Sequence, residues 1–223
     1  MNSSHYNSMN TPEELLQAYT ALFIFLGGSV SMSPEESGLP HICDSGLLRN
    51  LPVESHNPTY ERASQLLRSP CPFKQQCRLT VGSNYNSLLA DDKSAYAYPA
   101  ASRWKISGKT AEEHHALLGK LYAQYGYSRS EECGLEPDHL GIELLFVNLL
   151  LEKYLTEDDS TVKKIIRNDL FDFVSGEMLS WLPLWAEEVS AKSVTKCYTG
   201  IAGLIIGALE DVKDILSDQK LGL

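Results

Sequence analysis

The stretch that decides the fold runs from Glu136 to Leu151 and reads EPDHLGIELLFVNLLL. Polar residues and a proline come first, and nearly every later position is apolar. A helix that is apolar all round is normally buried on all sides, so we place the helix after Pro137 at the centre of a bundle. Asp138 and His139 then lie at the mouth of a buried helix. A catalytic pair, a metal site, a helix cap and a docking site for another protein are all compatible with these residue types.

The helix cap needs no chemistry beyond the helix itself. Glu136 is able to cap, and Pro137 suits the first helical position. Asp138 then lies in the first turn, where the helix dipole favours a negative charge. On this interpretation Asp138 and His139 only mark where the helix begins.

Helix signals dominate the rest of the chain. Thr11 and Thr110 each precede a glutamate by three residues, which is typical of a capping box, and Gly126 is a plausible stop for the second of these helices. Further helices are predicted over about 159–175 and 193–216, and loops over 27–57 and 90–108. Strand signals are nearly absent. The sequence predicts an all-α fold, a single helical bundle domain covering residues 1–223.

The charge balance indicates a basic partner. The chain of 223 residues has a net charge of −10, which disfavours nucleic acid, because phosphate backbones attract Lys and Arg. Residues 131–160 hold nine acidic residues and one basic residue, a net charge of −8. This concentration around Asp138 favours a partner that carries positive charge.

Two apolar runs are too short to cross a bilayer. The run at 21–26 has no basic flank and is interpreted as core helix, not as a signal peptide. The run at 198–209 is far below the ~20 residues of a membrane span, and its Gly203 and Gly207 indicate close helix packing. We expect a soluble, cytoplasmic protein.

Metal and catalytic signatures are weak. The five cysteines are scattered and odd in number, which does not indicate a disulfide framework; they are Cys43, Cys71, Cys77, Cys133 and Cys197. His114 and His115 are adjacent and therefore point about 100° apart on a helix. No HExxH, GxSxG or phosphate-binding loop occurs. We expect no enzyme, no metal and no cofactor. The competing class is a metal-dependent helical hydrolase that uses His114, His115 and Asp138.

The glutamate-proline-aspartate-histidine block before an apolar helix resembles the hallmark of the TorD/DmsD/NarJ family of molybdoenzyme-maturation chaperones. Supporting blocks lie at 85–89 (YNSLL), 98–104 (YPAASRW), 171–174 (FDFV) and 181–183 (WLP). The resemblance covers most of the chain from about Ala63 onward. It implies an all-helical, non-enzymatic, cytoplasmic protein that binds the N-terminal signal, often a twin-arginine leader, of a partner oxidoreductase.

Such a chaperone holds the apo-form of a molybdenum-containing catalytic subunit until its cofactor is inserted. A client without an exported leader, as in the nitrate reductase branch, is the alternative. Some members are reported to bind guanine nucleotide weakly, but no phosphate loop supports that here. The resemblance leaves open a monomer or a homodimer that swaps domains through a hinge near residues 128–136.

The resemblance also implies a peptide-binding surface. Its residues are Tyr85, Leu88, Leu89, Pro99, Ser102, Trp104, Glu136, Asp138 and His139. This sequence departs from the family pattern at Asp91-Asp92, at Ala100 and at Leu89, which implies a shallower and more acidic groove. We expect the apolar residues to set affinity and the acids to set orientation. His139 either touches the leader or fixes the bend before the helix.

Overall fold

The computed structural model describes residues 11–39, 48, 50–68, 74–91, 93–104, 108–128 and 134–218. Within these residues the chain is helical, and the one extended pairing is an isolated bridge between Ala100 and His139. The predicted all-α class is confirmed. The elements in order are α1 (Pro12–Ser31), α3 (Pro58–Arg68), α4 (Lys74–Leu88), η2 (Ala101–Arg103), α5 (Ala111–Gln124), α6 (Leu140–Thr156), α7 (Ser160–Asp172), η4 (Phe173–Met178), α8 (Leu182–Lys192) and α9 (Lys196–Asp218).

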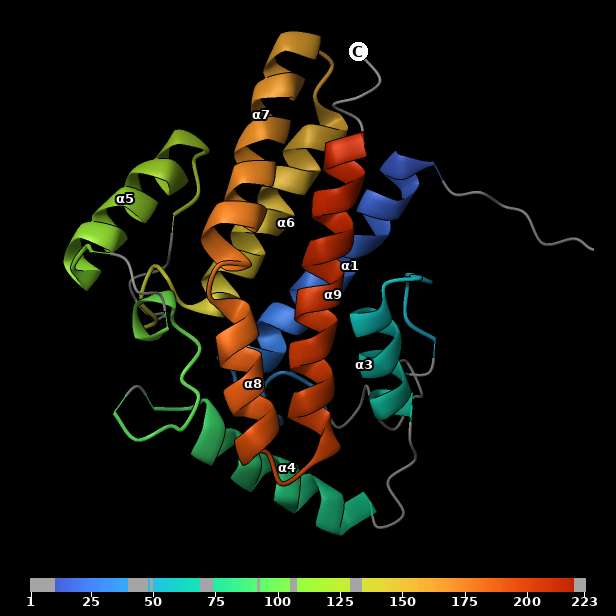
Figure 1. Cartoon of the computed structure of the whole chain (residues 1–223), viewed down its shortest axis with the longest axis vertical. Coiled ribbons are helices and arrows are strands. Elements are labelled where there is room, and N and C mark those ends of the chain that lie inside the picture. The colour runs from blue at the N-terminus through green and yellow to red at the C-terminus, as the bar shows by residue number, and fades with distance from the viewer. Residues whose placement is uncertain are drawn as a thin grey trace, which may run out of the picture.

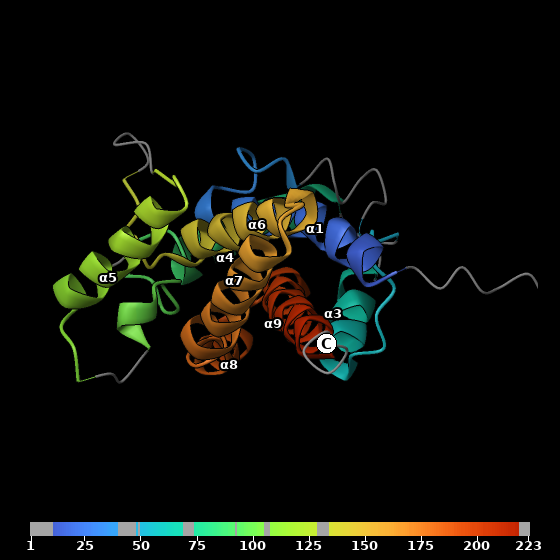
Figure 2. The same ribbon diagram turned by 90° about the horizontal axis from the view of Figure 1, so that it is seen from above.

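Helix α9 packs against α1, α3, α7 and α8 and is therefore the most central helix of the bundle, a place that the sequence analysis gave to α6. Helix α6 is largely buried, as its apolar sequence predicts, and it packs against α1 on one side and α7 on the other (Figures 1 and 2). The approach to α1 is close because two glycines meet: a Cβ on Gly141 would lie 3.1 Å from the carbonyl oxygen of Gly27 and would collide with Ser31. Most side chains of α6 are buried as a result, including that of Phe146.

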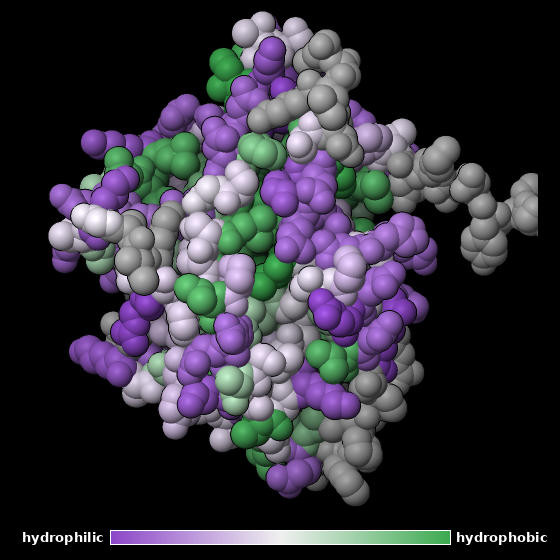
Figure 3. Space-filling view, viewed as in Figure 1, coloured by the Kyte–Doolittle hydropathy of each residue, from purple (hydrophilic) through white to green (hydrophobic). Residues whose placement is uncertain are grey.

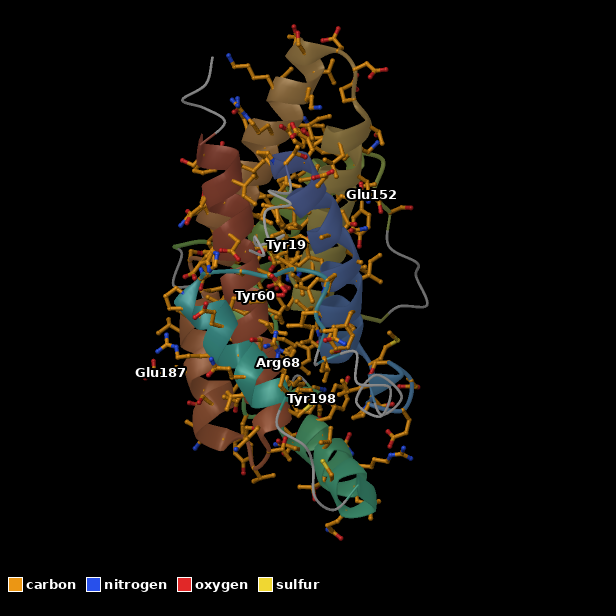
Figure 4. All side chains as sticks on the ribbon, turned by 90° about the vertical axis from the view of Figure 1, so that its right-hand side faces the viewer. Tyr19, Tyr60, Arg68, Glu152, Glu187 and Tyr198 are labelled. Atoms are coloured by element: carbon orange, nitrogen blue, oxygen red, sulfur yellow. The ribbon has the colours of Figure 1, made fainter. Side chains whose placement is uncertain are left out.

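Helix α9 packs against α3 along a strip of glycines. A Cβ on Gly203 would lie 2.8 Å from the Cβ of Ala63, and one on Gly207 would lie 2.6 Å from the backbone nitrogen of Tyr60. The predicted role of this glycine pair in close helix packing is therefore confirmed. Figure 4 shows Tyr19 of α1 and Tyr60 of α3 on this side of the molecule. The Tyr19 hydroxyl donates to Asp211 of α9 at 2.5 Å, which ties α1 to α9.

Helix α1 is the one described helix that is long and apolar enough, by length and composition, to cross a membrane. Half of its most apolar window is buried within the protein. Its buried side chains, among them Leu16 and Phe23, belong to the main core, and the helix packs against α6 and α9. A core helix of a bundle has these same properties.

The predicted helix ends are partly right. Both capping boxes form: Thr11 accepts from the amide of Glu14, and Thr110 accepts from the amide of Glu113. Gly126 has a φ of +70°, the left-handed conformation expected of a glycine just after a helix. The loop predicted from residue 27 is wrong at its start, since α1 continues to Ser31.

The start of α6 differs from the prediction. Pro137 is not the first helical residue and Glu136 is not the cap, because residues 136–138 form a turn outside the helix. His139 is the N-cap, and its ring accepts from the amide of Gly141. The turn is held in place by Pro99, whose carbonyl oxygen accepts from the amide of Leu140 at 2.7 Å.

Two features of the C-terminal half refine the predicted helices. The helix predicted over 159–175 begins with Asp159 as N-cap and changes at Phe173 into the π-helical turn η4. Pro183 does not end a helix; it occupies the first turn of α8, where a missing amide is tolerated.

The predicted hinge near 128–136 falls largely on residues 129–133, which lie outside the described residues. The single-domain assignment and the swapped dimer therefore stay predictions. Of the five cysteines, Cys77 and Cys197 are half-buried; Cys43, Cys71 and Cys133 lie outside the described residues.

Replacing glycine by alanine should have opposite effects on stability at Gly207, which belongs to the glycine strip, and at Gly119, which does not. Gly207→Ala places a methyl group against Tyr60, and we expect it to lower the free energy of unfolding by about 1–3 kcal/mol. Gly119→Ala is the control: it lies on exposed α5 with no atom within 4 Å of its Cβ, and should gain up to about 1 kcal/mol. Urea denaturation measures both. Equal stability of Gly207→Ala and wild type would contradict this packing.

Candidate functional site

The two blocks that carry the family resemblance meet in space. Residues 98–104 run alongside the start of α6, where the Ala101 amide donates to the carbonyl of Asp138 at 3.0 Å. The Leu140 amide donates to the Pro99 carbonyl, so two backbone hydrogen bonds join residues 98–104 to the start of α6. We call the contact between residues 98–104, residues 136–140 and α5 the junction.

The Asp138 side chain is at the centre of the junction and is 0% exposed. One carboxylate oxygen accepts from the Ser102 amide at 2.7 Å, and the other lies 2.7 Å from Nε2 of His115 on α5. The second ring nitrogen of His115 lies 3.5 Å from Glu136. Because a buried charge costs free energy unless it is paired, these contacts fix the loop, the turn and α5 to one another.

His139 caps α6 from inside the protein. Its side chain is 1% exposed, and Nδ1 accepts from the Gly141 amide at 3.1 Å. The rings of His139 and Tyr98 pack edge to face, with their centroids 5.5 Å apart. Burial lowers the pKa of His139 to about 4, against the opposing pull of the Asp138 charge. The ring is therefore neutral near pH 7, with its proton on Nε2, since Nδ1 is the acceptor.

The remaining predicted peptide-binding residues differ in accessibility. Leu88 and Leu89 are 0% and 2% exposed, and Tyr85 is buried with its ring 6.1 Å from that of Tyr198. Burial raises the pKa of Tyr85 to about 12. These side chains fill the interior in this conformation and leave no open apolar cleft of their own. Pro99 is buried as well.

Three of the nine predicted residues present surface. Ser102 and Glu136 are exposed, and Trp104 is half-buried with its indole nitrogen donating to the Tyr98 carbonyl at 2.8 Å. The structure therefore brings six of the nine predicted residues together at the junction and exposes only part of them, while Tyr85, Leu88 and Leu89 lie at the end of α4. Its role in binding a peptide stays a prediction.

A groove that the sequence analysis missed lies beside the junction. Helix α5 is set to one side of the bundle in both ribbon views (Figures 1 and 2). Between α5 and the α7–η4 segment is a groove of about 340 Å³. Its apolar lining comes from Leu117, Leu118, Leu121 and Phe173. The one signal in the sequence is the row of apolar residues along α5, which includes Leu117, Leu118 and Leu121.

Polar contacts at both ends of this groove hold α5. Nε2 of His114 lies 3.1 Å from the Glu177 carboxylate of η4. Toward the other end, the Tyr125 hydroxyl donates to Asp169 of α7 at 2.5 Å. Burial, and then this bond to Asp169, raise the pKa of Tyr125 above its ordinary value, so the tyrosine stays a donor.

The hydrolase alternative requires His114, His115 and Asp138 to converge. His115 does contact Asp138, but His114 contacts Glu177 on the groove side, and the two imidazole rings are 6.4 Å apart. Across the part of the chain that the structure describes, no group of three His, Cys, Asp or Glu side chains is arranged to hold a metal ion. The expected divergence of the two neighbouring histidines is what the structure shows.

The buried cap predicts a pH dependence of stability. Between pH 6.5 and about 4 the unfolded chain protonates His139 and the folded chain does not. As the pH is lowered across this window, the free energy of unfolding should therefore decrease, and His139 should account for about 3 kcal/mol of that decrease. In His139→Asn, an N-cap that does not titrate, urea titrations at several pH values should show a smaller decline. The same decline in both proteins would contradict the assignment.

A protein family and several curated proteins match this chain, and the family match spans the junction and the groove. The family described as nitrate reductase delta subunit matches residues 54–187. A chaperone protein TorD of Photobacterium profundum is 22% identical over 138 residues, which is 60% of this chain and 62% of that protein. TorD of Vibrio cholerae is 25% identical over 166 residues, 74% of this chain and 70% of that protein. The chain thus spans less than two thirds of the first relative. Because this family matches more than half of the chain, the chain belongs to the nitrate reductase delta subunit family, the TorD/NarJ family of chaperones.

Proposed function

We propose that this protein is a cytoplasmic chaperone that binds the N-terminal signal peptide of a molybdenum-containing oxidoreductase subunit. In this role it assists cofactor insertion and folding of the apo-form before export, and performs no reaction itself. The observation that carries the proposal is the family match over residues 54–187, which includes the whole junction. The relatives named as TorD chaperones support the same role.

The accessible part of the junction is proposed to meet the client peptide. Trp104 offers half-buried aromatic surface beside the exposed Ser102, and the Glu136 side chain is 59% exposed. A large aromatic side chain at the edge of a packed surface is a common centre of binding free energy. Glu136 would face a basic residue of the leader, and an exposed ion pair of this kind contributes only about 0–1 kcal/mol. Its effect is on orientation and association rate.

The buried members of the predicted set are proposed to support this surface from below. Asp138 holds the Ser102 amide, and the Leu88 carbonyl accepts from the Ala97 amide at 2.9 Å. His139 caps α6 directly under the loop. Direct contact between a peptide and Leu88, Leu89 or Asp138 would require the loop at 98–104 to move.

A second class of client is distinguished in the same test. The matched family is described as nitrate reductase delta subunit, and a client whose N-terminal segment lacks a twin-arginine motif and is not exported is therefore the second candidate. Among the described residues of the junction, Glu136 is exposed, and α5 adds the exposed Glu112 and Glu113 in its first turn. The sequence of the captured client separates the two classes.

The test has two steps. The full chain is used to capture its partner from the native organism, and the captured protein is expected to be an apo-molybdoenzyme subunit that is lost when its N-terminal segment is deleted. Calorimetry with that segment should then show about 30-fold weaker binding for Trp104→Ala.

Tyr96→Ala is the matched control, since Tyr96 is a 61% exposed aromatic residue in the same loop region, and it should stay within about twofold of wild type. Capture that does not depend on the client's N-terminal segment would refute the function. Equal effects of the two aromatic variants would refute the surface.

A further inference from the structure

Two segments of this acidic chain contain no acidic residue. Residues 62–90 and 189–209 together hold six basic residues and no Asp or Glu, although the whole chain has 29 acidic and 19 basic residues. A local excess of positive charge on a protein of negative net charge favours contact with a partner that is itself negative. Whether the two segments form one surface depends on where the fold places them.

The two segments meet at one end of the molecule. Asn84 of α4 accepts from the hydroxyl groups of Ser193 and Thr195 at 2.8 and 3.0 Å. Helix α4 lies across the end of the bundle at which α8 turns into α9 (Figure 1), and Figure 4 shows Arg68 near the same end. We call the four exposed basic side chains here the basic end: Arg68 of α3, Arg78 of α4, and Lys192 and Lys196 on either side of the turn between α8 and α9.

Apolar side chains project among these bases. Val194 in the turn between α8 and α9 is 73% exposed, and Leu79 on α4 is 67% exposed. Tyr96 is 61% exposed, and the Lys192 ammonium lies 5.5 Å from the centre of its ring. Figure 3 shows hydrophobic surface among hydrophilic side chains at this lower end of the molecule. Apolar residues flanked by Lys and Arg are typical of surfaces that bind the interface of a bilayer.

Three acidic residues flank the basic end, Asp91 after α4 and Glu187 and Glu188 on α8. The Asp91 carboxylate accepts from the Ser94 hydroxyl at 2.7 Å, and the Glu188 carboxylate lies 3.9 Å from the Lys192 ammonium. All three acids lie outside the two acid-free segments. The face made by α4 and the turn between α8 and α9 therefore keeps a positive charge.

The opposite end of the long axis is acidic. Glu157, Asp158 and Asp159 lie in the connection between α6 and α7, which Figure 1 shows at the far end from α4. A molecule whose charges are separated in this way takes a preferred orientation in the field of a charged surface. An anionic surface attracts the end formed by α4 and repels the other, so it selects one orientation of the protein.

We propose that the basic end docks this protein reversibly on an anionic lipid bilayer, with its Lys and Arg side chains among the headgroups and Val194 and Leu79 in contact with the interface. The apolar side chains project from separate elements. A fluid bilayer accommodates them without matching cavities, which a rigid acidic protein surface would have to provide. Each Lys or Arg near such a bilayer strengthens binding about fivefold, so the contact is reversible and sensitive to salt. The inference concerns a surface apart from the junction and does not rest on the proposed client.

The test is co-sedimentation of the full-length chain with lipid vesicles at neutral pH and low salt. One set of vesicles contains about 25% phosphatidylglycerol in phosphatidylcholine, and the other contains phosphatidylcholine alone. The chain should bind the anionic vesicles at least about tenfold more tightly than the neutral ones. Raising the salt from about 0.05 M to about 0.5 M should release it, because the Debye length falls below ~10 Å.

A pair of double variants locates the binding. Lys192→Glu with Lys196→Glu reverses two charges of the basic end and should weaken binding to the anionic vesicles by about tenfold or more. Lys163→Glu with Lys164→Glu makes the same change of net charge near the start of α7, toward the acidic end, and should stay within about twofold. Because both double variants change the net charge equally, general repulsion from the bilayer is the same in both.

A matched pair of valines tests the apolar contact. Val194→Ser should weaken binding to the anionic vesicles by about fivefold, because the interface no longer covers the valine methyl groups. Val162→Ser, on α7 and 41% exposed, is the control and should leave the affinity unchanged. Both side chains are exposed, so neither change removes core packing.

Equal binding to the two kinds of vesicle, or the same loss of affinity in both double variants, would overturn the proposal. Binding of a glutamate-rich helical peptide that is lost in Lys192→Glu with Lys196→Glu, when no vesicle binds, would assign the basic end to an acidic protein instead. The vesicle measurements use no client, so they decide the role of this surface independently of the capture experiment. A captured molybdoenzyme without vesicle binding would refute the docking and leave the proposed function intact, and vesicle binding without a captured client would refute only the function.

Discussion

The buried carboxylate of Asp138 is the constraint on which the arrangement of the junction depends. An ionised group without exposure needs partners that replace water, and Asp138 finds them 36 residues away at Ser102 and 23 residues away at His115. Leaving such partners unsatisfied costs about 1–3 kcal/mol for each buried group. One side chain therefore fixes a loop, a helix start and a peripheral helix to one another.

The attachment of α5 has a different character from that of the other helices. Its Tyr122 ring packs 4.6 Å from Phe146, and the Tyr122 hydroxyl donates to Pro137 at 2.8 Å. Its other links to the bundle include the polar contacts of His114, His115 and Tyr125. Water is able to replace polar contacts of this kind, whereas the glycine-based packing of α9 on α3 has no such substitute. The structure thus combines a tightly packed bundle with a helix that is held by two core side chains, Leu118 and Tyr122, and by polar contacts.

The sequence predicts the features of this structure that depend on residues close together in the chain, and misses those that depend on residues far apart in the chain. Local signals identified the two capping boxes, the buried run of α6 and the glycine strip of α9, because each is encoded within a few residues. The cap of α6 was misplaced because Pro137 also suits a turn, and the pairing with Pro99 that decides between them is distant in sequence. The resemblance named the nine candidate site residues, but it gave no information on which of their side chains are exposed. Whether Leu88 faces a cleft or the core is set by tertiary packing. The groove could not be predicted, because its two walls are far apart in the chain.

The positions of His114 and His115 link the groove beside α5 to the junction. Adjacent residues of one helix contact the groove wall and the junction carboxylates, so α5 cannot shift relative to one without disturbing the other. His114 holds α5 to Glu177 of η4, and His115 holds it to Asp138 at the start of α6. Because neighbouring side chains of a helix point about 100° apart, the two contacts together resist rotation of α5 about its own axis. The fixed orientation of α5 in turn keeps Leu118 and Tyr122 directed into the core.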